Sequence, residues 1–187
     1  MLIYRRLEVQ RCVAAERNPI DVLEIIARVK NIVPDVTLDF YGYASPVEVQ
    51  KEVEERVKAL GLEEVVTFKG YQTDDVLGPA LDQAKALLSV SKGEGFGMHI
   101  LEAMSHGVPV VAYKVKYGVN ELVQAGVSGK VVPYAAVDTA VKALVEVLQG
   151  NLEQSTYDYA QNFNQAAAWQ QWLNTKQMIN NIFAKEN

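Results

Sequence analysis

Glu94 lies inside a glycine-rich stretch and Glu102 follows it, with seven residues between the two glutamates. An apolar run that predicts a β-strand precedes the stretch, whose glycines are Gly93, Gly95 and Gly97, and a helix-forming run follows. The first N–H groups of a helix lack partners within it, so this junction could bind an anion such as phosphate. Carboxylates do not suit phosphate, but they accept hydrogen bonds from hydroxyl groups. Phosphate and hydroxyl groups together indicate a sugar nucleotide.

The segments around the glycine stretch alternate between predicted strands and predicted helices. Gly107 ends the helix that carries Glu102, because glycine accepts the left-handed backbone of a C-terminal cap. The alternation predicts a parallel sheet with helices on both faces. Six strands are predicted, at residues 2–4, 36–41, 65–68, 87–90, 108–113 and 130–133.

Three other kinds of site fit the sequence poorly. A dinucleotide motif requires a third glycine where Met98 stands, and Gly129–Val131 lacks the Ser or Thr of a P-loop. His99 and His106 have no metal-binding partners at suitable spacing and no nucleophile partner for a hydrolytic triad. Both are predicted to be helix residues, and a contact between His99 and the ligand stays open. No Asp-x-Asp pair occurs, so we expect no metal.

Composition and charge exclude several classes of protein. The 187 residues suit one domain, and the net charge of −5 argues against nucleic acid or an acidic membrane as the partner. No apolar run approaches the ~20 residues of a transmembrane helix. A single cysteine, Cys12, excludes an internal disulfide and fits the cytoplasm. The strand-like start at residues 2–4 predicts that no signal peptide is present.

The central motifs resemble those of the retaining family 4 glycosyltransferases with the GT-B fold. The spacing of Glu94 and Glu102 matches the Glu-x7-Glu signature of that family. The Lys116–Gly118 segment is similar to poly(glycerol-phosphate) α-glucosyltransferases and to relatives that glycosylate teichoic acids or serine-rich proteins. The resemblance implies a Rossmann-like three-layer α/β domain with a six-stranded parallel sheet, the donor-binding C-terminal half of such an enzyme. It also rests on residues 101–104, 106–111, 117–121 and 126–129.

The resemblance also implies a role for each residue of the donor site. Glu94 contacts hydroxyl groups of the transferred sugar, and Glu102 accepts hydrogen bonds from the ribose of the nucleotide. Tyr71 lies in a turn near the base, where it either stacks on uracil or makes no ligand contact. Glu121 orders the loop beside the donor. The segment whose backbone covers the sugar and the diphosphate contains Gly95, Phe96, Gly97 and Met98.

Basic side chains are expected to stabilise the departing nucleoside diphosphate, because negative charge grows on it in the transition state. Arg6 matches the family's arginine at the end of the first strand, and its guanidinium can bind two phosphate oxygens. Glu16–Pro19 matches a Glu-Lys-Asn-Pro run, with Arg17 in place of the lysine. Arg11 competes with Arg17 for this second basic position, and Arg6 and Arg17 could each instead be a surface residue.

We therefore expect residues 1–187 to be a fragment, the donor-binding part of a retaining hexosyltransferase, without the N-terminal acceptor domain of the same enzyme. It would bind a UDP-sugar and move glucose or GlcNAc to a teichoic acid or protein of the cell wall, and would be inactive alone. A non-catalytic nucleotide-sugar-binding or interaction module is the alternative. A C-terminal helix at about 165–184 carries Trp169 and Trp172, which either face the missing domain or pack on this one.

Overall fold

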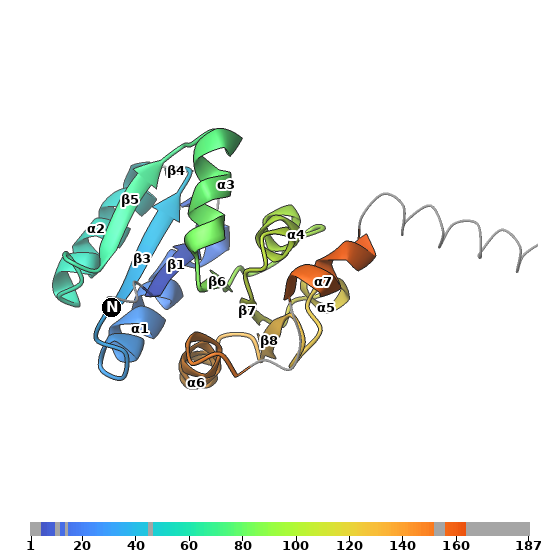
Figure 1. The fold of residues 1–187 in the computed structure, drawn as a ribbon. Helices are drawn as coiled ribbons and strands as arrows, with labels where there is room; N and C mark the ends of the chain where they lie inside the picture. The colour runs from blue at the N-terminus through green and yellow to red at the C-terminus, as the bar shows by residue number, and fades with distance from the viewer. Residues whose placement is uncertain (1–4, 10–11, 14, 45–46, 152–155, 164–187) are drawn as a thin grey trace, which may run out of the picture.

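A computed structural model describes residues 5–9, 12–13, 15–44, 47–151 and 156–163 of the chain (Figure 1). Its main sheet has the strand order β5-β3-β1-β6-β7-β8, and every neighbouring pair is parallel. After β1 the chain builds outward through β3 and β5, and it then returns to add β6 on the other side of β1. The strands are β1 (Arg5–Val9), β3 (Val36–Tyr41), β5 (Val66–Gly70), β6 (Ala86–Ser89), β7 (Val110–Tyr113) and β8 (Gly129–Val132).

Helices cover both faces of this sheet, so the domain has the three layers of a Rossmann-like α/β fold (Figure 1). One face is covered by α1 (Pro19–Lys30), α2 (Val47–Ala59) and α6 (Val137–Leu148). The other face is covered by α3 (Asp74–Gln83), α4 (Met98–Ser105), α5 (Val119–Leu122) and α7 (Thr156–Ala160). The predicted α/β alternation is therefore confirmed.

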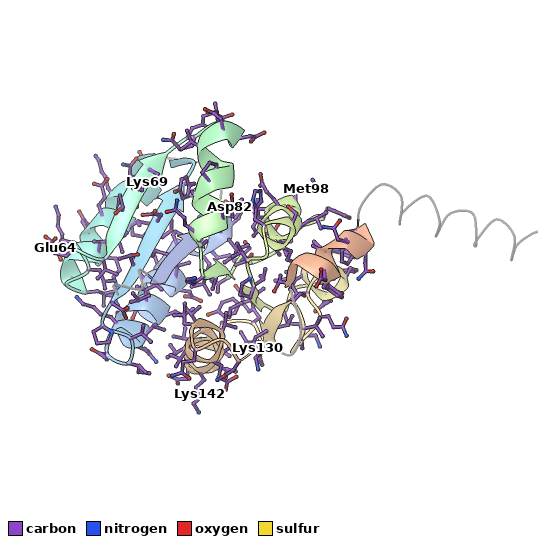
Figure 2. All side chains as sticks on the ribbon, in the orientation of Figure 1. Glu64, Lys69, Asp82, Met98, Lys130 and Lys142 are labelled. Carbon is purple, nitrogen blue, oxygen red and sulfur yellow. The ribbon has the colours of Figure 1, made fainter. Side chains whose placement is uncertain are left out.

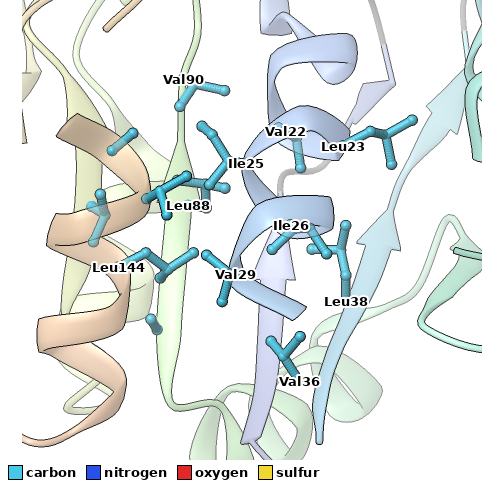
Figure 3. Close-up of a cluster of buried hydrophobic side chains, with 14 of the residues drawn as sticks. Val22, Leu23, Ile25, Ile26, Val29, Val36, Leu38, Leu88, Val90 and Leu144 are labelled. Carbon is cyan, nitrogen blue, oxygen red and sulfur yellow. The ribbon is translucent and has the colours of Figure 1, made fainter. Parts of the chain in front are cut away.

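The larger core lies between the sheet and the helices α1, α2 and α6 (Figure 3). Val22, Ile26 and Val29 repeat at the three- and four-residue spacing that puts side chains on one helix face, and all are fully buried. They pack with Leu38 of β3 and Leu88 of β6. Burying a side chain of this size contributes roughly 1.5–3 kcal/mol, so this face fixes α1 on the sheet.

Strand β6 contributes side chains to the cores on both faces of the sheet. Leu88 belongs to the core beneath α1, while Leu87 belongs to the opposite core beneath α3 and α4. Adjacent residues of a strand point to opposite faces, so a strand covered on both faces reads as an unbroken apolar run. This explains why Ala86–Ser89 was recognisable as a strand without an alternating pattern.

The first strand begins later than predicted. The structure places it at Arg5–Val9, where Leu7 lies opposite Leu38 of β3 and Ala86 of β6. Arg6 pairs with Thr37 and is the second residue of the strand, so the prediction that it stands at the strand's C-terminal end is wrong. The register fixes β1 through Leu7 and Val9, which lie opposite apolar residues of β3, and the arginines therefore fall at its start.

A second sheet of two short parallel strands was not predicted. It is formed by β2 (Cys12–Val13) and β4 (Tyr43–Ala44), which follow β1 and β3 in the chain. The predicted helix at about 165–184, with Trp169 and Trp172, lies outside the described residues. None of the helices in the described part of the chain has the length and apolar character needed to cross a membrane.

Candidate functional site

Loops from the carboxyl ends of β1 and β6 meet at the centre of the sheet. Strand order reverses between these two strands, and ligands of open α/β sheets bind in the crevice outside such a reversal. The first loop contains the short 3-10 helix η1 (Ala15–Arg17), and the second is the glycine stretch before α4. The N–H of Lys92 donates to the carbonyl of Glu16 at 2.8 Å, which ties the two loops together.

Two of the predicted site residues, Arg17 and Glu94, form an ion pair across this junction. Arg17 donates through Nη1 to Glu94 Oε1, and the same nitrogen lies 3.5 Å from Ser91 Oγ. The Glu94 side chain is only 5% exposed, whereas 34% of the Arg17 side chain remains accessible. The arginine therefore holds the carboxylate in place and still presents part of its guanidinium to solvent.

His99 joins the same cluster, which the sequence did not predict. Its Nε2 lies 3.7 Å from Glu94 Oε1 and 3.0 Å from Ser89 Oγ. Ser89 is the last residue of β6 and is buried, while His99 is the second residue of α4. The two residues are ten positions apart, and only the sharp turn of the glycine stretch brings them together.

The turn into α4 depends on two glycines. Gly97 caps the helix with a left-handed backbone, at φ 85° and ψ 42°. Gly118 packs against the stretch from the start of α5, and a Cβ added there would lie 2.8 Å from the carbonyl oxygen of Phe96. The backbone of the stretch is thus fixed, while the side chains of Phe96 and Met98 are exposed. Met98 is labelled in Figure 2.

Glu102 lies one turn into α4 and is half-buried. It follows His99 by three positions, and residues three apart on a helix share a face. Because His99 contacts Glu94, the signature glutamates sit around the same end of α4. The arrangement can offer carboxylate oxygens to hydroxyl groups beside the N-terminal N–H groups of the helix.

Tyr71 lies at the same edge of the sheet, immediately after β5. Its side chain is exposed and lines a small hollow formed where β3 and β5 end and α3 begins. An exposed aromatic ring beside a hollow suits the flat face of a base. The hollow is lined by Tyr41, Gly42, Tyr71, Gln72, Asp74 and Leu77.

The structure separates Arg6 from this site. Arg6 stands near the start of β1, whereas the crevice lies beyond the opposite, carboxyl end of the strands. Arg11 falls outside the described residues. Among the arginines proposed for the phosphates, Arg17 is therefore the one that the described residues place beside Glu94. Within the described part of the chain, no group of three or more His, Cys, Asp or Glu residues could hold a metal ion.

Two part-buried hydrogen bonds to Asp21 anchor the turn that carries Arg17. Asn18 has a left-handed backbone, with φ 57°, and its side-chain amide donates to Asp21 Oδ2 at 3.0 Å. The hydroxyl of Tyr113, at the end of β7, donates to the same oxygen at 2.9 Å. Burial, and then the bond to Asp21, raises the pKa of Tyr113 well above its usual value. The turn after η1 is thus fastened to the sheet.

Replacing Tyr113 by Phe tests this anchor. We expect the variant to lose about 1 kcal/mol of unfolding free energy at pH 7, because Asp21 loses a buried donor. The unfolded tyrosine releases its proton near pH 10, before the folded one, so wild-type stability falls as the pH rises above about 10. The Tyr113→Phe variant has no hydroxyl to ionise at this position, so its stability should fall less above about pH 10. Urea unfolding at pH 7 and above pH 10 measures both effects, with the exposed Tyr117→Phe as the control.

The fold and the site define a three-layer α/β domain with a carboxylate–guanidinium pair at the point where strand order reverses. Comparison with known proteins is more specific. The profile of the glycosyl transferases group 1 family matches residues 9–168. The chain belongs to this family.

Individual relatives agree with that assignment. The chain is 30% identical over 167 residues to poly(glycerol-phosphate) alpha-glucosyltransferase of Bacillus subtilis (strain 168), covering 88% of this chain and 23% of that protein. The pneumococcal O-GlcNAc transferase GtfA, solved with UDP and GlcNAc, superposes with a TM-score of 0.76 at 21% identity, over 94% of this chain and 36% of GtfA.

A third protein is similar over nearly the whole chain. Anabaena Alr3699/HepE, solved in complex with UDP, gives a TM-score of 0.71 at 25% identity, with 97% of this chain and 49% of that chain covered. The chain thus spans about a quarter of the Bacillus relative and about half or less of the two solved structures. These structures are GT-B enzymes, and the fold of this chain matches part of them.

Proposed function

We propose that this chain is the donor-binding part of a glycosyltransferase and that its crevice binds a UDP-sugar. The observation that carries the proposal is the Arg17–Glu94 pair, placed at the reversal of strand order and beside the start of α4. Neighbouring structures contain UDP or UDP with GlcNAc, and this supports a uridine nucleotide. The donor sugar is glucose or GlcNAc in this proposal, by analogy with the relatives named above.

Each part of the crevice has one task in the proposed complex. Glu94 accepts hydrogen bonds from hydroxyl groups of the sugar, and Glu102 does so from the ribose. The first N–H groups of α4 face the diphosphate, where the helix dipole adds positive potential. The exposed part of Arg17 binds the phosphate oxygens while Nη1 stays on Glu94. Tyr71 stacks on the base.

In the proposed reaction, the bond between the anomeric carbon and the diphosphate oxygen breaks as the acceptor hydroxyl attacks. The leaving phosphate takes the acceptor's proton on the same face, so the α configuration is kept and no side chain has to act as base. Arg17 and the start of α4 stabilise the charge that grows on the phosphate. This step needs no metal ion, and the metal-free reaction stays a prediction.

The rest of the enzyme is also part of the proposal. A second domain would bind the acceptor, for which a teichoic acid or a protein is proposed, and transfer would occur between the two domains in the cytoplasm. Arg6 has no part in it, because its position in β1 is away from the crevice. Arg11, the alternative to Arg17 for the second basic position, lies outside the described residues. Alone, the chain would bind donor and transfer almost nothing.

A non-catalytic nucleotide-sugar-binding module remains the second candidate, because the chain covers only part of its relatives. Combining the chain with an acceptor domain and assaying transfer separates the two. Glycosylated product supports the enzyme, whereas UDP binding without product supports the module.

Glu102→Ala tests the donor site itself by isothermal titration calorimetry with UDP. We expect about tenfold weaker binding, because the ribose hydroxyls lose a charged acceptor. Glu146→Ala removes an exposed glutamate of α6, which pairs with Lys130 of β8, and serves as the matched control. If Glu102→Ala and the control bind UDP equally well, or if the folded wild-type chain binds none at millimolar concentration, the proposed site is wrong.

A further inference from the structure

His99 and Arg17 both face the same oxygen of Glu94. The guanidinium Nη1 of Arg17 donates to Oε1, and the imidazole Nε2 of His99 lies 3.7 Å from that atom. Among the described residues, no hydrogen bond reaches Oε2. The carboxylate is therefore held through one oxygen, and the other can serve a ligand.

His99 is itself fixed in place. Its Nε2 lies 3.0 Å from the hydroxyl of Ser89, which is buried at the end of β6, and its backbone belongs to the first turn of α4. Only 12% of the His99 side chain is exposed. A ring held by strand and helix can keep a neighbouring carboxylate in one orientation, whereas a solvated side chain would let it rotate.

Arg17 alone would hold Glu94 less well. Its side chain is one-third exposed and, in the proposed function, it is also required by the phosphates. Arg17 is long and flexible and also binds phosphate in this proposal, so it restrains the Glu94 carboxylate less than the buried ring of His99 does. The imidazole thus supplies an orientation for Glu94 that does not depend on the diphosphate.

Resting on the function proposed above, we propose that His99 is a positioning residue that orients the Glu94 carboxylate toward the hydroxyl groups of the donor sugar. It contributes in this way to binding of the sugar and not of the nucleotide. The contacts proposed for the ribose, the base and the diphosphate are made by Glu102, Tyr71, Arg17 and the start of α4, and none of them involves the His99 ring.

Binding of UDP and of UDP-glucose by the same variants gives the first test. We expect His99→Ala to weaken UDP-glucose binding about fivefold and to leave UDP binding within twofold. His99→Gln keeps a side-chain N–H donor and should restore most of the loss. His106→Gln is the matched control. His106 lies at the other end of α4, and its Nδ1 is 2.7 Å from Asp82 Oδ1.

A second measurement does not need the ligand. The ring signals of His99 are followed by NMR against pH in the wild type and in Glu94→Gln. Loss of a carboxylate near the ring destabilises the imidazolium, so the titration midpoint of His99 should move to lower pH in the variant. The ring signals of His106, which pairs with Asp82 at the other end of α4, serve as the reference.

The outcomes separate this inference from the proposed function. Equal loss of UDP and UDP-glucose binding in His99→Ala, no rescue by His99→Gln, or an unchanged His99 midpoint in Glu94→Gln would each overturn the positioning role while leaving the donor site intact. A folded wild-type chain that binds no UDP would overturn the proposed function and the role of His99 together.

Discussion

Replacing Arg17 by Ala is expected to weaken UDP binding by about a hundredfold. A charged hydrogen bond to a phosphate contributes about 1.5–3 kcal/mol, and its loss accounts for most of that factor. The substitution also leaves Glu94 without its cation, with a side chain only 5% exposed. An unpaired carboxylate near the diphosphate repels the ligand, which adds to the loss.

Isothermal titration calorimetry at constant ionic strength measures the loss of UDP affinity. One conservative variant and one control variant are compared with Arg17→Ala. Arg17→Lys keeps the charge but cannot bind the carboxylate and the phosphate through a planar fork, so we expect an intermediate affinity. Arg28→Ala removes an exposed arginine near the C-terminal end of α1, which pairs with Asp138 of α6. This variant should bind UDP as the wild type does. If Arg17→Ala matches Arg28→Ala, Arg17 does not bind the nucleotide.

Most of the fold could be predicted because the pattern that specifies it is local. The buried strands are short apolar runs, and the helices between them carry apolar residues at three- and four-residue spacing, as α1 does from Val22 to Val29. Strand β1 was predicted too early because residues 2–4 are as apolar as Leu7 and Val9. Only the register with β3 and β6 distinguishes the two segments.

The site was predictable to the extent that its residues belong to sequence motifs. The sequence named Glu94 and Arg17, and the structure brings them together across 77 positions of the chain. The contact of His99 with Glu94 could not be predicted, because it depends on how sharply the glycine stretch turns into α4. The anchor from Tyr113 to Asp21 spans 92 positions and carries no motif.

The prediction that Arg6 lies at the C-terminal end of the first strand was wrong because it came from a sequence motif alone. A match between Tyr-Arg-Arg-Leu and a family motif fixes residue types, but the crevice is defined by the end of the strand. Because β1 spans Arg5–Val9, Arg6 lies near its amino end, whereas the crevice lies beyond the carboxyl ends of the strands.

Replacing Gly118 by Ala is expected to cost about 3 kcal/mol of unfolding free energy and to weaken UDP-glucose binding at least tenfold. Gly118 has φ 76° and ψ −65°, and the N–H of Val119 donates to the carbonyl of Tyr117 at 2.9 Å, which makes a γ-turn. Side chains are strained in this backbone conformation, at a cost of about 1–3 kcal/mol. The new methyl would also lie 2.8 Å from the carbonyl oxygen of Phe96 and 3.4 Å from Cβ of Glu94.

The methyl group cannot be accommodated by a side-chain rotation, because its nearest neighbour is backbone. Either the turn before α5 or the glycine stretch has to move, and movement of the stretch displaces Glu94 and the cap of α4 together. Gly93→Ala is the control, since its added Cβ meets nothing within 4 Å. Urea unfolding and calorimetry with UDP-glucose should show both losses in Gly118→Ala and neither in Gly93→Ala. A stable Gly118→Ala variant with wild-type affinity would mean that the stretch tolerates displacement and that its geometry does not set donor binding.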